Sequence, residues 1–131
     1  MHKLPLRIYY EDTDAQGVVY YANYLRFFER ARTEYLRDVG YNQQSLLEQG
    51  GIFVVRKLEM KFNKPAILDN EILIKTKLIK LGKVSFNFIQ KAFLEDNLLV
   101  EASVFCGCIG KKKFKPMALP KQLLEGMRTL L

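Results

Sequence analysis

Four consecutive stretches of the chain alternate apolar and polar residues with a period of two. They are Ile52 to Asn63, Glu71 to Lys80, Lys83 to Leu94 and Leu98 to Gly110. Such alternation is typical of half-buried strands. The Leu81-Gly82 and Asp96-Asn97 turns are too short to hold a crossover helix, so the strands that they join run antiparallel. The sequence therefore predicts an antiparallel meander.

One amphipathic helix precedes these strands. From about Tyr21 or Asn23 to Val39, apolar residues recur at helical spacing, and charged residues occupy the opposite side. The apolar positions are Tyr24, Leu25, Phe28, Ala31, Tyr35, Leu36 and Val39. Gly40 is expected to end the helix in a left-handed conformation. Arg32 falls inside the apolar arc, where either its head reaches water past a packed stem or it forms a buried ion pair.

A shorter strand, Leu4 to Tyr10, comes before the helix, with Leu4, Leu6 and Ile8 on one face. Pro5 favours an edge position for it, because proline donates no ladder hydrogen bond. One helix with about five antiparallel strands predicts an α+β domain, 1–131, in which the sheet wraps the helix. Exposed sheet edges are commonly covered by a second subunit, so we expect a homo-oligomer.

Composition narrows the class of protein. The chain has 49% hydrophobic and 27% charged residues, as in soluble globular proteins. No apolar run is long enough for a membrane span and the first residues lack a signal-peptide core, so we expect a cytoplasmic protein. Cys106 and Cys108 are two apart in one strand and poorly placed for a disulfide. His2 is the only histidine, which disfavours a zinc site.

The net charge of +7 is unevenly distributed. Residues 1–50 carry six Lys or Arg against seven Asp or Glu, and residues 51–131 carry fifteen against seven. Such a field attracts nucleic acid, anionic lipid or a phosphorylated small molecule, and charge alone does not choose among them. A merely solvated basic surface is an equally good interpretation.

The segment Y-Y-E-D-T-D-A-Q-G-V-V-Y-Y-A-N-Y, Tyr9 to Tyr24, joins the first strand to the helix. It contains Glu11, Asp12, Asp14, the turn residue Gly17 and Asn23, which is expected to cap the helix. A carboxylate beside the free N–H groups of a helix start suits attack on a carbonyl. Asp12 and Asp14 also suit a purely turn-forming role, which we prefer for Asp12. A glycosidase pair of Glu11 and Asp14 is disfavoured, since no aromatic platform for a sugar is apparent.

This segment, with F-E-R-A-R-T-E-Y-L-R, F-V-V-R-K and M-A-L-P-K further on, resembles the YbgC-type acyl-CoA thioesterases. These are relatives of 4-hydroxybenzoyl-CoA thioesterase in the hotdog-fold superfamily, and the resemblance covers essentially the whole chain. It implies a hotdog fold, a five-stranded antiparallel sheet wrapped around one long central helix. It also implies a homodimer or homotetramer with active sites at subunit interfaces. The implied reaction hydrolyses acyl-CoA to free acid and CoA without a metal or other cofactor, and nucleic acid has no part in it.

The same resemblance implies roles for particular residues. Asp14 is the catalytic nucleophile or general base, and the backbone N–H of Tyr21 polarises the thioester carbonyl. Because a thiolate leaves readily, one carboxylate with one oxyanion donor can suffice. Many YbgC-type proteins carry histidine where Tyr21 stands, and the hydroxybenzoyl branch carries an aromatic residue. Further candidates for substrate binding are Gly17, Val18, and for the CoA phosphates Lys83 or the run Lys111 to Lys115.

Two alternatives stay open at this point. One is a thioesterase that acts on acyl carrier protein, an acidic partner that would also favour a basic face. The other is a noncatalytic module that binds phosphorylated ligands, lipid headgroups or nucleic acid. Turnover separates the two classes, because a module would bind CoA or polyanions without releasing a free thiol.

Overall fold

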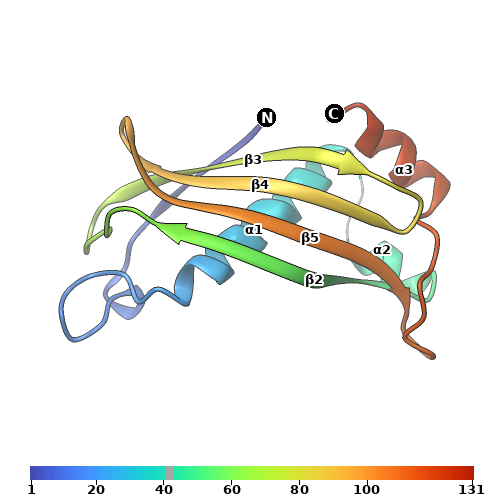
Figure 1. Cartoon of the computed structure of the whole chain (residues 1–131), viewed down its shortest axis with the longest axis horizontal. Coiled ribbons are helices and arrows are strands. Elements are labelled where there is room, and N and C mark those ends of the chain that lie inside the picture. The colour runs from blue at the N-terminus through green and yellow to red at the C-terminus, as the bar shows by residue number, and fades with distance from the viewer. Residues whose placement is uncertain (41–42) are drawn as a thin grey trace.

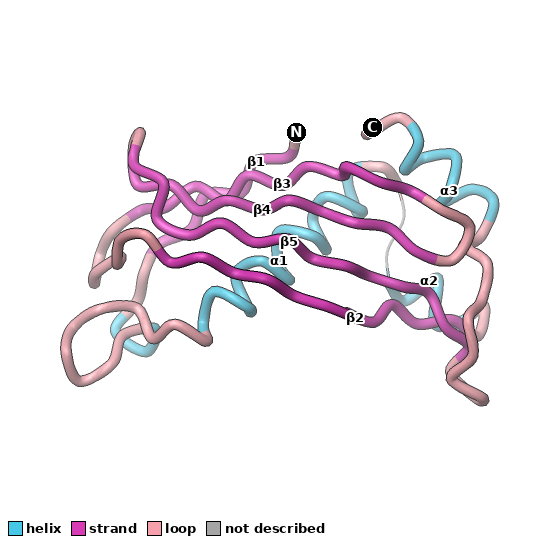
Figure 2. Tube along the Cα trace, viewed as in Figure 1, coloured by secondary structure: helices cyan, strands magenta, loops and turns pink. Residues whose placement is uncertain are grey.

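Helix α1 (Asn23–Asp38) lies across one face of an antiparallel sheet (Figure 1). The structure is a computed structural model that describes residues 1–40 and 43–131. The strands are β1 (His2–Arg7), β2 (Gly51–Phe62), β3 (Glu71–Leu81), β4 (Ser85–Leu94) and β5 (Asn97–Gly110). The other helices are α2 (Gln43–Glu48) and α3 (Lys121–Arg128), and a single 3₁₀ turn spans Tyr10–Asp12. Loops, pink in Figure 2, gather at the two ends of the sheet.

The sheet has five strands in the order β1-β3-β4-β5-β2, and every neighbouring pair is antiparallel. Strands β3, β4 and β5 form the expected meander, and β1 and β2 are the two edges. The predicted α+β architecture, a sheet wrapped around one long helix, is confirmed. We call the side of the sheet that faces α1 the inner face, and the other side the outer face.

The inner face and α1 enclose the core. Helix α1 buries Tyr24, Phe27, Phe28, Ala31, Tyr35 and Leu36. Leu25, predicted to be in the apolar arc, is 42% exposed, whereas Phe27, absent from that prediction, is 2% exposed. Steps of about 100° per residue place these two side chains on opposite rims of the arc. The Leu25 rim lies beside the edge strand β2, near Val55 and Leu58, and this edge leaves Leu25 uncovered.

Both edge strands differ from the predictions, β1 in where it ends and β2 in its alternation. Strand β1 ends at Arg7 rather than Tyr10, because the chain turns into the 3₁₀ turn, although Leu4, Leu6 and Ile8 do face the core. Pro5 does lie in an edge strand, opposite Leu73. In β2 the register shifts between Val55 and Lys57. This bulge breaks the expected alternation. Phe53 packs against Phe86 in a T-shaped arrangement, with the two ring centroids 5.0 Å apart.

Arg32 does not form the buried ion pair that was one of the two roles expected for it. Its guanidinium donates to Gln90 Oε1 at 2.8 Å, and no carboxylate lies within 4.0 Å of it in the described part of the chain. Gln90 is fully buried and donates to the Phe28 carbonyl and to Thr76 Oγ1, both at 2.9 Å. Burial lowers the pKa of Arg32, and the nearby Glu29 opposes that shift. A neutral amide thus accepts the hydrogen bond of this half-buried cation.

The helix ends as predicted. Gly40 has a φ of +82°, and its N–H donates to the Arg37 carbonyl at 2.9 Å, which forms a left-handed cap. Both cysteines are reduced and buried in β5, also as predicted. Burial raises the pKa of the Cys106 thiol to about 11, although the Arg32 charge acts in the opposite direction.

Candidate active site

The acidic segment begins with a tight turn that Asp12 stabilises. The Tyr9 N–H donates to Asp12 Oδ2 at 2.8 Å, and the Thr13 hydroxyl donates to the Tyr10 carbonyl at 2.8 Å. An aspartate side chain that bonds the N–H three residues earlier fixes the local backbone. Asp12 therefore has the turn-forming role that we preferred for it.

Residues 12–20 then fold back on themselves as a small antiparallel loop. The Asp14 N–H donates to the Val18 carbonyl at 2.9 Å, and the Tyr20 N–H donates to the Asp12 carbonyl at 3.0 Å. At the tip, the Gly17 N–H donates to the Asp14 carbonyl at 3.0 Å. Gly17 has a φ of +82°, a conformation that a residue with a Cβ adopts only with strain. The sequence thus folds this loop through one glycine.

The Asp14 carboxylate is half-buried within the loop. Its Oδ1 accepts a hydrogen bond from the Gln16 N–H at 2.9 Å. Its Oδ2 has no protein donor among the described residues. One oxygen is therefore fixed by the backbone, and the other is free to meet a ligand.

The start of α1 does not have the cap that we predicted. Asn23 is the first helical residue rather than the cap, and the cap position, Ala22, offers no side-chain acceptor. The Asn23 side chain instead donates through Nδ2 to the Asp12 carbonyl at 2.9 Å, because the acidic loop passes beside the helix. Within the described residues, the N–H groups of Tyr21 and Ala22 have no acceptor. The helix therefore begins with uncapped donors.

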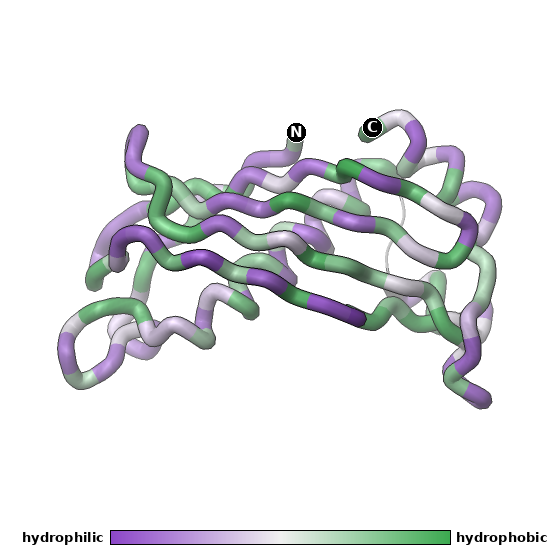
Figure 3. Tube along the Cα trace, viewed as in Figure 1, coloured by the Kyte–Doolittle hydropathy of each residue, from purple (hydrophilic) through white to green (hydrophobic). Residues whose placement is uncertain are grey.

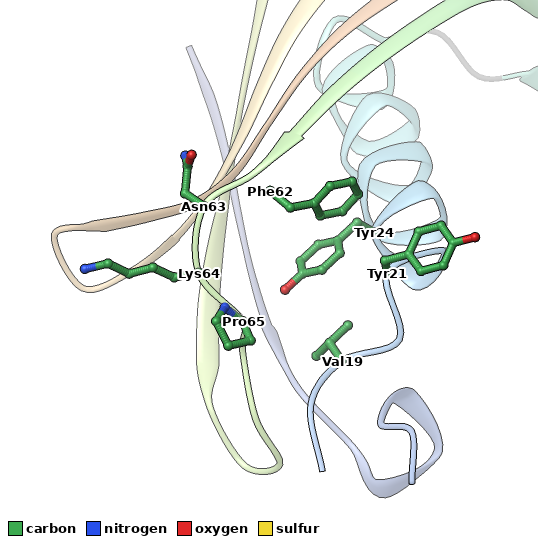
Figure 4. A pocket seen from close by; sticks show the side chains of 7 residues that line it. All are labelled: Val19, Tyr21, Tyr24, Phe62, Asn63, Lys64 and Pro65. Atoms are coloured by element: carbon green, nitrogen blue, oxygen red, sulfur yellow. The ribbon is translucent and has the colours of Figure 1, made fainter. Parts of the chain in front are cut away.

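A pocket of about 270 Å³ lies beside these donors (Figure 4). It is lined by Val19, Tyr21, Tyr24, Phe62, Asn63, Lys64 and Pro65. The Phe62 ring meets the edges of Tyr21 and Tyr24, with ring centroids 6.1 and 6.0 Å apart. Figure 4 shows the Tyr24 ring between Phe62 and Val19, with the Tyr21 phenol directed away from the pocket. Burial raises the pKa of the Tyr24 phenol, which keeps it neutral.

The structure brings some of the sequence candidates together and separates others. Asp14, Gly17 and Val18 belong to one loop and Tyr21 directly follows it, but only Tyr21 among them lines the pocket. Lys83 lies in the turn between β3 and β4, where its carbonyl accepts from the Leu119 N–H at 2.8 Å. That turn is at the opposite end of the sheet from the acidic loop (Figure 1). A single chain therefore does not place Lys83 beside Asp14.

The Lys111 to Lys115 run lies at the same distant end of the sheet as Lys83. It follows β5, and the Gly110 N–H donates to the Lys115 carbonyl at 2.9 Å. The residues that sequence reasoning missed are Phe62 to Pro65, the wall of the pocket opposite α1. Pro65 signalled the end of a strand, but nothing in the sequence indicated that this end faces the helix start.

Three further features of the described residues concern metal ligands, the histidine and the length of the helices. No group of three or more His, Cys, Asp or Glu side chains that could hold a metal ion occurs in residues 1–40 and 43–131. His2 stacks on Tyr35 at 5.3 Å and contacts Asp38 at 3.0 Å, near the far end of α1. None of the helices in the described part has the length and apolar character needed to span a bilayer.

Comparisons with known proteins agree with this arrangement. A family model described as the thioesterase-like superfamily matches residues 9–127. Acyl-CoA thioester hydrolase YbgC of Escherichia coli O6:H1 is 44% identical over 125 residues, 95% of this chain and 93% of its own. Acyl-CoA thioesterase YbgC of Haemophilus influenzae is 43% identical over 127 residues, 96% and 93% of the two chains. A crystal structure of a probable thioesterase from Bartonella henselae has a TM-score of 0.86 and 41% identity, covering 91% of this chain and 98% of that one.

The sheet wrapped around α1 is the hotdog fold, and the chain is a thioester hydrolase of the thioesterase-like superfamily. Identity above 40% across nearly the whole of two relatives gives a closer assignment. The chain belongs to the YbgC family of acyl-CoA thioesterases. A noncatalytic binding module, one of the two alternatives considered above, is therefore excluded as its class.

Proposed function

We propose that the chain, as one domain, hydrolyses acyl-CoA to a free acid and CoA, with Asp14 as nucleophile or general base. The Tyr21 N–H polarises the thioester carbonyl. The observation that carries this proposal is the unpaired Tyr21 N–H beside an aromatic pocket, one short loop away from a carboxylate with a free oxygen. Curated relatives named acyl-CoA thioesterases support the choice of substrate.

The chemistry needs little more than these two groups. With the carbonyl oxygen on the Tyr21 N–H, the positive end of the α1 dipole stabilises the oxyanion of the tetrahedral intermediate. One such donor is worth roughly 3 kcal/mol of transition-state stabilisation. Asp14 either attacks the acyl carbon to form an anhydride that water hydrolyses, or it takes a proton from the attacking water. In both routes the C–S bond breaks, and CoA leaves as a thiolate that is protonated in solution.

Histidine has no part in this mechanism. Tyr21 stands where many YbgC-type proteins carry histidine, and its phenol points away from the pocket. The chain's one histidine, His2, is held against Tyr35 and Asp38 near the other end of the helix. The carboxylate of Asp14 is therefore the base or nucleophile that the acidic loop can provide, together with the backbone donors of the helix start.

A second copy of the chain completes the site in this proposal. The pocket is open on one side, and Lys83 lies at the other end of the sheet from Asp14. An antiparallel pairing of two β2 edges in a homodimer, or in a homotetramer built from two such dimers, brings opposite ends of the two sheets together. Lys83 of one subunit can then meet the CoA phosphates while Asp14 of the other meets the thioester, and Gly17 and Val18 shape the entrance. The reduced cysteines fit a cytoplasmic location.

A thiol-release assay across acyl-CoA chain lengths and aromatic acyl-CoAs tests the function. We expect turnover of at least one class, and a loss of at least a hundredfold in Asp14→Asn. Asn keeps an oxygen that can accept from the Gln16 N–H, so the loop is retained and the melting temperature stays near the wild-type value. Asp12→Asn is the matched control, whose activity loss should follow its loss of stability. Near-normal turnover by a folded Asp14→Asn protein would remove Asp14 from the reaction.

Acyl-pantetheine and acyl-carrier-protein substrates test the phosphate contacts. If lysines bind the CoA phosphates, acyl-pantetheine should show a raised KM with little change in kcat, the sign of lost uniform binding. The KM for acyl-CoA should rise with salt, since exposed charges are screened. Equal KM values for acyl-CoA and acyl-pantetheine at low salt would argue against any phosphate contact. A much lower KM for acyl carrier protein than for CoA would favour the carrier as the natural substrate.

A further inference from the structure

The outer face of the sheet carries lysines that the proposed reaction does not use. Cα register places Lys3 of β1 opposite Lys75 of β3, and Lys75 opposite Lys91 of β4. Directly opposed residues of an antiparallel sheet point to the same side, so these three ammonium groups form a row on one face. Lys77, two residues along β3 from Lys75, lies on that face as well. We call Lys3, Lys75, Lys77 and Lys91 the lysine face.

This row of like charges is unusual within its own sheet. Like charges directly opposite each other on neighbouring strands destabilise a sheet. Lys3, Lys75 and Lys77 have no carboxylate within 4.0 Å in the described part of the chain, whereas Lys91 forms an ion pair with Glu101 at 3.9 Å. The ammonium of Lys75 rests over the Phe93 ring, 4.6 Å from its centroid. Three of the four positive charges of this face therefore have no ion-pair partner among the described residues.

The other half of the outer face is different. On β2, Lys57 pairs with Glu59 at 2.9 Å, and Lys61 lies opposite Glu101 of β5. Lysine and glutamate alternate there, as on an ordinary solvated surface. The excess of charge is thus confined to β1, β3 and β4, and the outer face itself supplies a comparison region.

Apolar side chains lie among the lysines of this face. A depression of about 240 Å³ is lined by Lys75, Lys77 and Lys91 together with Met1, Ile79, Ile89 and Phe93. Met1 is 70% exposed and Ile79 is 49% exposed. Figure 3 shows hydrophobic and hydrophilic segments alternating along β3 and β4, whose outer side faces the viewer with α1 behind. Lysine stems and apolar tips share one surface.

The geometry points to the lysine face as a docking surface for anionic phospholipid bilayers. Lysines are attracted to the negative surface of such a membrane, and each contributes about a fivefold gain in binding. Exposed Met1 and Ile79 can enter the interface between headgroups and acyl chains, which a soluble polyanion does not offer. Nucleic acid is a poorer fit, because the arginine on this side, Arg7, already pairs with Glu71 at 2.9 Å. Docking also leaves the pocket open, since that pocket lies at the start of α1 on the other side of the sheet.

Sedimentation with lipid vesicles tests this docking surface. The wild-type protein should bind vesicles that contain phosphatidylglycerol and should not bind pure phosphatidylcholine vesicles. Lys75→Gln/Lys91→Gln should weaken that binding about thirtyfold. Lys57→Gln/Lys61→Gln removes the same charge from the other half of the same face and should bind nearly as the wild type. Equal loss in the two double variants, or no wild-type binding to anionic vesicles, would overturn the proposal.

A third variant separates lipid from other anionic partners. Ile79→Ser keeps every charge, so it should weaken vesicle binding severalfold and leave binding to polyglutamate or duplex DNA unchanged. The opposite result is binding to polyglutamate or DNA that depends on Lys75 and Lys91, without binding to vesicles. That result would overturn membrane docking and indicate an acidic macromolecule as the partner. Thermal melting confirms that each variant is folded, and hydrolysis of a short-chain acyl-CoA in solution should be unchanged in all of them. Vesicle binding is read independently of hydrolysis, so the two proposals can fail separately.

Discussion

Asn23 Nδ2 donates to the carbonyl of Asp12 at 2.9 Å, across eleven residues of chain. The bond ties the first residue of α1 to the acidic loop, so the loop that carries Asp14 and the helix start that carries Tyr21 are held as one unit. Its energy is that of an ordinary hydrogen bond, about 1 kcal/mol. In the proposed reaction, which uses both groups, its effect on rate should be larger than this energy suggests, because small misplacements of catalytic groups are costly.

Replacement of Asn23 tests this hydrogen bond. Asn23→Ala should lower the free energy of unfolding by about 1 kcal/mol and lower kcat by more than the loss of folded protein explains. Asn23→Asp should be worse in both respects, since a carboxylate repels the Asp12 carbonyl that it faces. Urea unfolding and steady-state kinetics give the two numbers. Wild-type kcat in Asn23→Ala would show that this hydrogen bond does not position the proposed catalytic groups, Asp14 and Tyr21.

A second prediction concerns the buried amide that holds Arg32. Gln90→Leu leaves a half-buried guanidinium and the Thr76 hydroxyl without their partner, so we expect a loss of roughly 3 kcal/mol in unfolding free energy. The added change Arg32→Met should recover part of this loss, because the uncompensated charge is gone. Gln122→Leu, at an exposed position of α3, is the control and should stay within about 0.5 kcal/mol of the wild type. Additive losses in the double variant would mean that the two side chains are not coupled.

A third prediction follows from the raised pKa of Cys106. Burial raises the pKa of the thiol to about 11 in the folded chain, from an ordinary value of 9.0. Between these values the unfolded chain has lost the proton and the folded chain keeps it, so stability falls as pH rises from 9 to 11. The full difference is about 3 kcal/mol, and all of it is retained below pH 9.

We would measure unfolding curves of the wild type and of Cys106→Ala across this pH range. Tyrosines and lysines also titrate there, but they do so in both proteins, so the difference between the curves gives the contribution of the Cys106 thiol. The free energy of the wild type should fall more steeply with pH than that of the variant. Thiol labelling at neutral pH should also be slow until the protein unfolds. Parallel curves for the two proteins would contradict a buried, high-pKa thiol.

A fourth prediction addresses the shared site. Asp14→Asn chains mixed with Lys83→Glu chains should form heterodimers with about one working site, because the Lys83→Glu chain supplies an intact Asp14 and the Asp14→Asn chain supplies an intact Lys83 to the same site. The assay needs conditions in which each parent is inactive, and mass measurement must show the heterodimer. Confirmed heterodimers without activity above the parents would count against Lys83, and a fully active monomer would rule out a shared site.

Much of this fold is visible in the sequence because its signals are local. Periodicity predicted α1 and the meander, and Gly40 and the Leu81-Gly82 turn predicted where elements end. The bulge near Arg56 was not predictable, since one extra residue in a strand merely looks like a weaker alternation. The exposure of Leu25 depends on where an edge strand lies, which periodicity does not contain.

The candidate site was predictable only in part, because residues that are far apart in the sequence form it. Asp14 and Tyr21 fall in one continuous motif, but the opposite wall comes from the end of β2, about forty residues further along the chain. The partner of Arg32 is 58 residues away, and a glutamine in an apolar strand gives no sign of it. Asn23 was misassigned because a residue that suits a cap also suits a bond to a neighbouring loop, and only the path of that loop decides between them.

The two edges of the sheet are unequal, and this limits how copies of the chain can add to one another. Strand β2 offers a free edge of twelve residues, whereas β1 offers six and includes Pro5, which has no N–H to donate. Two chains that pair through β2 expose only β1 edges, and a proline on such an edge disfavours the addition of another strand. In such a pair, the proline on each remaining edge would oppose further strand addition and so the extension of the sheet into a fibre.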